Sequence, residues 1–212
     1  HDLVMVGEPE VDTAALPQPS SGVMHLLRKC PTPVWVMHPS LVGELRILAL
    51  VDPDLSDPVR DGLNDLVLEL ATSLARRLDG ELHVGHAWTM EGEATLRTSP
   101  IVELPGRIVD VMVNDTESFH RDQLNVLTAR HHLDELGASI HLVSGEPDVV
   151  LARLADRLGI GLIVMGTVGR TGLRGLIMGN TAETILRSVR CSVLAVKPEG
   201  FRTPVKLRRG SP

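Results

Sequence analysis

A glycine-rich segment, residues 166–180, holds the residue types in this sequence best suited to chemistry. It follows an apolar run that predicts a strand and precedes an amphipathic run that predicts a helix. Backbone N–H groups in such a position attract anions, because a helix N-terminus carries unpaired donors. Arg170 and Arg174 add positive charge, and Asn180 with Glu183 predicts an N-cap with a capping box. The segment therefore predicts phosphate binding, and the alternative is a connector whose glycines only permit tight turns.

The segment matches neither of two common phosphate-binding motifs. No Gly-Lys-Ser/Thr follows its glycines, as it would in a Walker A loop, and the G-x-G of the dinucleotide-binding fingerprint is missing. Any phosphate site here must therefore belong to another class of protein.

Nine histidines and two cysteines are the other candidates for chemistry. His83 and His86 lie three apart on a predicted strand and so should face opposite sides. Neither H-E-x-x-H nor a cysteine pair with zinc spacing occurs. We expect Cys30 and Cys191 to behave as small apolar residues. These residues predict neither a metal site nor a catalytic group.

The elements that must position the glycine-rich segment alternate regularly along residues 41–199. The predicted strands are residues 45–52, 81–88, 139–143, 161–166 and 192–197, and the predicted helices are residues 58–78, 115–136, 148–158 and 181–189. Asp57 should cap the first of these helices, before Pro58. The alternation predicts an α/β fold with an open parallel five-stranded sheet and helices on both faces. Ligands of such sheets bind beyond the carboxyl ends of the strands, here after Asp52, Trp88 and Gly166.

The first 40 residues repeat the end of this pattern. Shifted by 159 positions without gaps, residues 2–7 fall on residues 161–166, residues 26–29 on residues 185–188, and residues 33–36 on residues 192–195. The match predicts an internal repeat. We therefore expect residues 1–40 to be the C-terminal remnant of a degenerate first domain, residues 41–199 a complete domain, and residues 200–212 a tail. The strands of the remnant should borrow cover from the complete domain or from a second chain.

Composition excludes several classes of protein. The net charge of −6 argues against a nucleic-acid binder, and 2% aromatic residues give little surface for stacking bases. No apolar run approaches the roughly 18 to 20 residues of a membrane span. Two cysteines and an N-terminus unlike a secretory signal predict a reduced, cytoplasmic protein.

The spacing Gly166-x2-Gly169-x9-Gly179 resembles the nucleotide-binding signature of the universal stress protein family, G-x2-G-x9-G-[S/T]. Further motifs resemble the tandem-domain branch of that family, its E type, and the resemblance covers essentially the whole chain. These motifs are Gly169-Arg-Thr-Gly172, Gly179-Asn-Thr-Ala-Glu183, Leu26-Leu-Arg-Lys-Cys-Pro31, Val102-Glu-Leu-Pro105 and Lys197-Pro-Glu-Gly-Phe201.

The resemblance implies a sheet of order 3-2-1-4-5 and a pocket for ATP or AMP, with Mg²⁺ as a further expectation. Carried over by position, Asp52 would contact adenine or ribose, and Val84 would line the adenine slot. The phosphate-binding residues would be Gly166, Gly169, Arg170, Gly179 and Asn180. Tandem members join their domains through the last strands, which predicts that the strand from Val34 to Met37 lies beside the strand from Val193 to Val196, or that a homodimer forms there.

The sequence departs from the family pattern at three points. Asn180 replaces Ser or Thr, although its amide can still donate to phosphate. Asp54 adds a second carboxylate near Asp52, which would repel polyphosphate unless a metal intervened. Glu10 and Ser20 replace the signature glycines in the N-terminal copy, so that half should not bind nucleotide.

We therefore expect a cytoplasmic stress-response binding protein that acts through dimerisation or partner contacts and does not turn over a substrate. The alternative is a scaffold, or a carrier of a different metabolite such as a lipid-linked molecule or a sugar nucleotide. Slow ATP hydrolysis is a third hypothesis, and the sequence offers no general base for it.

Overall fold

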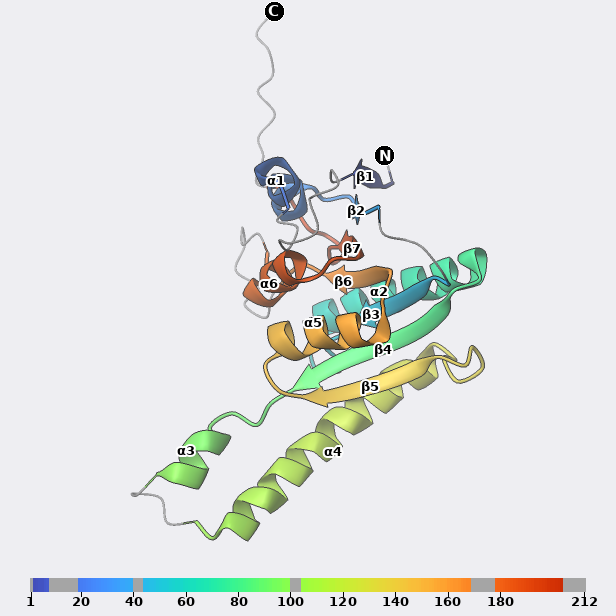
Figure 1. Cartoon of the computed structure of the whole chain (residues 1–212). Coiled ribbons are helices and arrows are strands. Elements are labelled where there is room, and N and C mark those ends of the chain that lie inside the picture. The colour runs from blue at the N-terminus through green and yellow to red at the C-terminus, as the bar shows by residue number, and fades with distance from the viewer. Residues whose placement is uncertain (1, 8–18, 40–43, 100–103, 169–177, 204–212) are drawn as a thin grey trace, which may run out of the picture.

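The computed structural model describes residues 2–7, 19–39, 44–99, 104–168 and 178–203. Within these residues, seven strands form one sheet in the order β1-β2-β7-β6-β3-β4-β5 (Figure 1). The strands are β1 Val4–Gly7, β2 Val34–Met37, β3 Arg46–Leu50, β4 Glu81–Trp88, β5 Ser139–Ser144, β6 Leu162–Gly166 and β7 Ser192–Val196. The helices are α1 Ser21–Lys29, α2 Pro58–Leu78, α3 Glu93–Thr98, α4 Gly106–Arg130, α5 Pro147–Leu158 and α6 Asn180–Ser188.

The predicted strand order is confirmed for the part of the sheet from β3 to β7. Numbered from β3, the order β5-β4-β3-β6-β7 is 3-2-1-4-5, and each neighbouring pair is parallel. The sheet continues beyond these five parallel strands, because β1 and β2 of the N-terminal unit join it and β2 pairs with β7 in the antiparallel direction. β2 satisfies the backbone donors and acceptors that β7 would otherwise expose as an edge strand. The result is a mixed sheet of seven strands.

The N-terminal unit β1-α1-β2 matches the unit β6-α6-β7 at a constant offset of 159 residues. α1 and α6 have the same length and the same bounds under this offset, and Val4 pairs with Val34 as Ile163 pairs with Val193. Between the two units, Trp35 pairs with Leu194, the residue 159 positions after it. β2 and β7 therefore meet about an approximate two-fold axis through this pair.

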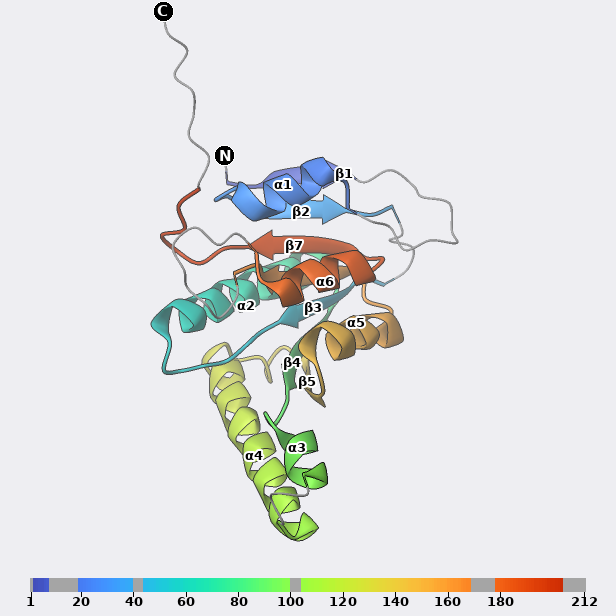
Figure 2. The same cartoon turned by 90° about the vertical axis from the view of Figure 1, so that its left-hand side faces the viewer.

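Helices cover both faces of the sheet, as predicted (Figure 2). On one face, α1, α5 and α6 bury a cluster that includes Leu27, Leu154 and Ile185. On the other face, α2 and α4 bury Leu68 and Leu127 against the strands. Burial of these aliphatic side chains drives the assembly, since each contributes about 1.5–3 kcal/mol when removed from water. α1 thus packs into the same core as α5 and α6, and the remnant shares its cover with the rest of the chain.

α2 begins and ends as its sequence predicts. The Oδ1 atom of Asp57 accepts hydrogen bonds from the N–H groups of Val59 and Arg60, and Pro58 occupies the first turn, where its missing N–H costs nothing. Asp79 ends the helix in the left-handed conformation, with φ 52°. This cap fixes the start of α2 directly after the loop that leaves β3.

α4 differs from the prediction at both ends. It begins at Gly106 and not at residue 115, and it ends at Arg130, where residues 131–137 form turns. α3, which we did not predict, lies between the predicted strand of residues 81–88 and the predicted helix of residues 115–136. α3 and the first half of α4 project beyond the sheet in both views (Figures 1 and 2). Apolar residues there, such as Ile108 and Met112, stay exposed, so the sequence has no core-facing periodicity that marks the start of the helix.

Among the described residues, no helix is long and apolar enough to cross a lipid bilayer.

Candidate functional site

Asp52 lies two residues beyond the carboxyl end of β3, at the point where the strand order reverses between β4 and β6. The side chain of Asn64, on α2, holds its backbone at both polar atoms. Asp52 N–H donates to Asn64 Oδ1, and Asn64 Nδ2 donates to the Asp52 carbonyl, each at 3.0 Å. Asn64 is 4% exposed, so this amide pairing extends the end of β3 inside the protein. Ligands of open α/β sheets bind at such a switch point, and Asp52 faces it on a fixed backbone.

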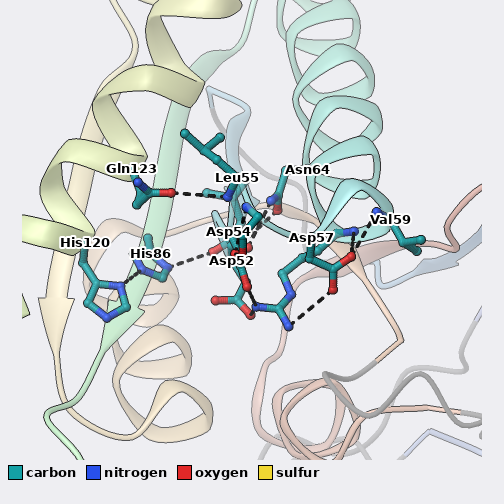
Figure 3. A network of polar contacts seen from close by, with 12 residues as sticks. Asp52, Asp54, Leu55, Asp57, Val59, Asn64, His86, His120 and Gln123 are labelled. Atoms are coloured by element: carbon teal, nitrogen blue, oxygen red, sulfur yellow. Dashed lines mark hydrogen bonds and ion pairs between the residues drawn. The ribbon is translucent and has the colours of Figure 1, made fainter.

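Arg60 lies in the first turn of α2 among three carboxylates (Figure 3). Its Nη1 atom is 2.8 Å from Asp54 Oδ2 and 3.7 Å from Asp52 Oδ2, and its Nη2 atom is 3.7 Å from Asp57 Oδ2. The side chain of Arg60 is 20% exposed. A cation at a helix N-terminus opposes the helix dipole, and the three carboxylates offset this cost. The site therefore carries one guanidinium inside an acidic rim.

A histidine pair supports the loop from the α4 side. Nδ1 of the buried His86 lies 3.1 Å from the carbonyl oxygen of Val51, and its Nε2 lies 2.9 Å from Nδ1 of His120 (Figure 3). Because a carbonyl only accepts, Nδ1 of His86 carries a hydrogen; in a neutral His86, Nε2 then accepts from His120. The pair connects the residue before Asp52 to α4. Gln123, also on α4, accepts from the N–H of Leu55 at 3.3 Å.

The glycine-rich segment leaves and re-enters the described structure close to α2 and β7. A Cβ atom on Gly166 would lie 2.6 Å from Cδ2 of Leu63, so a larger residue here would force the Leu63 side chain on α2 to shift. Gly179 N–H donates to the carbonyl of Thr167 at 2.8 Å, which brings the two ends of the segment together. The signature positions Gly166 and Gly179 therefore lie at the carboxyl edge, beside the strand that leads to Asp52.

The prediction that Asn180 caps α6 with Glu183 in a capping box is wrong. Gly179 is the N-cap, without a side-chain hydrogen bond, and Asn180 is the first helical residue. Glu183 instead accepts from Arg28 and Arg187 at 2.7 and 3.2 Å. Its hydrogen bond with Arg28, followed by that with Arg187, lowers the pKa of its carboxyl. Glu183 pairs with Arg28 on α1 and not with the local backbone N–H of the predicted cap, because the guanidinium supplies a full positive charge.

The remaining predicted site residues are not brought to this edge by the described structure. Val84 is fully buried in the middle of β4, level with Ala49 of β3, and Asp52 lies three residues further along the chain. Contact between Val84 and a ligand would require the surrounding core to move, and its role stays a prediction. Gly169 and Arg170 lie outside the described residues.

Comparison with known proteins identifies the relatives of this architecture. The family model described as "Universal stress protein family" matches residues 46–197. The chain belongs to the universal stress protein family.

Similar members are themselves longer than this chain. Universal stress protein E of Salmonella typhi is 32% identical over 214 residues, which cover 98% of this chain and 64% of that protein. Universal stress protein E of Escherichia coli (strain K12) is 31% identical with the same coverage. A Pseudomonas aeruginosa UCBPP-PA14 crystal structure, described as a universal stress protein, has a TM-score of 0.71 at 25% identity, and the match covers 93% of this chain and 63% of that one. The chain thus spans less than two thirds of the length of each of these three relatives.

Lys197 is a buried cation beside the same edge, and the sequence analysis did not single it out as a site residue. Its ammonium donates to the Leu27 carbonyl at 2.6 Å and to Thr167 Oγ1 at 3.3 Å, and it lies 5.1 Å from the ring centroid of Phe201. Within the described residues it has no carboxylate partner at ion-pair distance. Burial lowers the pKa of Lys197 to about 8. The residue joins α1 to the strand end from which the glycine-rich segment leaves.

The other histidines form no metal site in the part of the chain that the structure describes. His83 faces away from His86, as predicted, and its Nδ1 lies 3.1 Å from Nε2 of His141 on β5. Burial lowers the pKa of His141, and the charges of His83 and Arg157 lower it further. No group of three or more His, Cys, Asp or Glu residues there has an arrangement that could hold a metal ion. A cavity of about 600 Å³ lies elsewhere, between α2 and the end of α4, lined in part by Arg76 and His132.

Asn64, Arg60 and His120 are the site residues that sequence reasoning missed. Their types carry no motif, and their spacing from Asp52 acquires meaning only when α2 and α4 pack against the sheet. A weak signal existed for Asn64, since a polar residue interrupts the apolar face of the predicted helix.

Proposed function

We propose that this chain is the ligand-binding part of a universal stress-type protein and takes an adenine nucleotide, ATP or AMP, at the carboxyl edge beside Asp52. The observation that carries the proposal is the position of Asp52 at the switch point, with both backbone atoms fixed by Asn64. A fixed carboxylate there can accept hydrogen bonds from ribose hydroxyls or from the adenine amino group. The described ends of the glycine-rich segment lie at the same carboxyl edge, Gly166 as the last residue of β6 and Gly179 as the N-cap of α6.

We propose that the protein acts by binding and not by turnover. A hydrolase would need a group that positions and deprotonates water, and the carboxylates of Asp52 and Asp54 already contact Arg60. A cytoplasmic location and contacts with a second copy or with a further domain belong to the same proposal. The antiparallel pairing of β2 with β7 within this chain supports the proposal of such contacts, because it joins two similar units in one sheet.

Isothermal titration calorimetry with AMP and ATP tests the nucleotide proposal. We expect heat of binding for the wild-type chain, and a weaker affinity for Asp52→Asn, which keeps the shape of the side chain but removes its charge. Asp79→Asn is the matched control, because Asp79 lies at the far end of α2. Thermal unfolding gives a second readout: a ligand at a hundredfold excess over its Kd stabilises the folded state by about 2.7 kcal/mol.

The absence of both heat and thermal stabilisation at millimolar nucleotide would refute the proposal. It would favour the scaffold or the carrier of a different metabolite. Equal affinity of Asp52→Asn and wild type would leave nucleotide binding intact but remove Asp52 from the site.

A further inference from the structure

Asp54 poses a problem for any phosphate ligand at this edge. Asp52, Asp54 and Asp57 lie within one short stretch of chain, and three carboxylates repel a phosphate unless a positive charge compensates them. The sequence suggests a divalent metal for this role. The donor arrangement does not fit one, because each of the three carboxylates has an oxygen within 3.7 Å of the Arg60 guanidinium (Figure 3).

Arg60 lies where a positive charge would compensate the three carboxylates. It lies in the first turn of α2, one helical turn before Leu63, whose side chain lies where a Cβ atom on Gly166 would point. Residues three apart on a helix are neighbours on its surface. Arg60 and Leu63 therefore lie on one face of α2, Arg60 beside the three carboxylates and Leu63 beside Gly166.

The hydrogen bonds around Arg60 fix its carboxylate partners as well. Asp54 Oδ1 accepts from the N–H and the hydroxyl of Ser56, at 3.1 and 2.6 Å, so its Oδ2 is left to meet the guanidinium. The Oδ1 atom of Asp57 accepts the capping hydrogen bonds of α2, so its Oδ2 atom likewise faces Arg60. A guanidinium has five N–H donors, so the contacts of Arg60 with described residues leave donors for a further anion.

We propose that Arg60 is a specificity-determining residue of the nucleotide site: it offsets part of the negative charge of the acidic rim and donates to phosphate itself, so that a phosphate group is accepted without a divalent metal. The inference rests on the proposed function. It assigns the phosphate selectivity of the site to a side chain outside the glycine signature.

Calorimetry with two ligands in EDTA separates charge from shape. AMP carries the phosphate, whereas adenosine presents the same base and sugar without charge. We expect Arg60→Gln to weaken AMP binding on the order of tenfold and to leave adenosine binding unchanged, since loss of a close charge partner typically costs this much or more. Mg²⁺ added to the Arg60→Gln variant should restore part of the AMP affinity.

Three further variants control for folding and for net charge. Arg60→Lys keeps the positive charge and should retain most of the AMP affinity. The double variant Arg60→Gln/Asp54→Asn removes one charge of each sign and should regain most of what Arg60→Gln loses. Arg76→Gln removes the same charge from the far part of α2 and should bind AMP like wild type. Thermal unfolding of each variant confirms that it is folded.

Equal AMP affinities of wild type and folded Arg60→Gln would overturn the inference and leave the proposed function standing. Wild-type binding that requires Mg²⁺ would do the same. If the wild type binds neither AMP nor adenosine, with or without Mg²⁺, both the inference and the proposed function fail.

Discussion

Replacing Lys197 with methionine should change how the stability of the protein depends on pH. Lys197 is 6% exposed, and its ammonium group is held by the Leu27 carbonyl and the Thr167 hydroxyl, both uncharged. Burial away from water disfavours its charged form, which is why its pKa falls from 10.5 to about 8 in the folded state. In the unfolded chain the amine regains its ordinary pKa.

The direction of the effect follows from the two pKa values. Below pH 8 the amine is charged in both states, and the cost of burying the charge is fully present. As the pH rises from 8 toward 10.5, the folded protein loses its proton before the unfolded chain does, so folding becomes more favourable. With these two values the free energy of unfolding gains about 2.5 kcal/mol from Lys197 between pH 7 and pH 10, at 1.36 kcal/mol per pKa unit.

Urea denaturation of wild type and of Lys197→Met at several pH values measures this gain. The quantity to follow is the difference between the two free energies of unfolding, because other titrating groups, such as the cysteines, cancel in it. The chain contains no tyrosine, so phenol ionisation does not contribute to the alkaline baseline. We expect the difference to move in favour of wild type as the pH rises. A difference that stays flat from pH 7 to pH 10, or that moves in favour of the variant, would show that Lys197 is not a buried charge in solution.

Three other perturbations have defined outcomes. Burial raises the pKa of Cys191 from 9.0 to about 12, so the stability that the neutral thiol contributes is lost as the pH rises from 9 toward 12. In urea denaturation, the free energy of unfolding of wild type should fall by about 2 kcal/mol between pH 8 and pH 10.5 relative to that of Cys191→Ala. Parallel pH curves for the two proteins would contradict this. Gly166→Ala should lower the free energy of unfolding by about 1–3 kcal/mol, because its methyl group overlaps Leu63. In a Leu63→Ala background the same substitution should cost much less. A double-mutant cycle in which the two losses simply add would exclude the contact. His132 has φ 51° in the turn after α4, a left-handed conformation that glycine adopts at lower cost than histidine. His132→Gly should therefore stabilise the protein by about 1 kcal/mol, measured by thermal unfolding. A lower melting temperature would mean that the imidazole itself stabilises the turn.

Local rules predicted most elements of this fold. The bounds of α2 and β4 agree with the sequence because a cap with proline marks one, and a continuous apolar run marks the other. The start of α4 failed for the opposite reason: its first turns project beyond the sheet, so their apolar residues follow no core-facing pattern. The prediction of the α6 cap failed because Glu183 pairs with the Arg28 guanidinium on α1, and no local pattern predicts a partner 155 residues away.

The resemblance to the universal stress protein family supplied the strand order of the complete domain. The sequence by itself determined the alternation of strands and helices, the offset of 159 residues between the two repeated units, and the position of Asp52 at the end of a predicted strand. These follow from periodicity, turn residues and motif spacing, which act over short stretches of chain. Only the tertiary structure decided that β2 pairs antiparallel with β7, that Asn64 holds the Asp52 backbone, and that Arg60 lies among three carboxylates. Those contacts depend on how α2 and the N-terminal unit pack against the sheet, and packing is a property of the assembled chain that no single segment encodes.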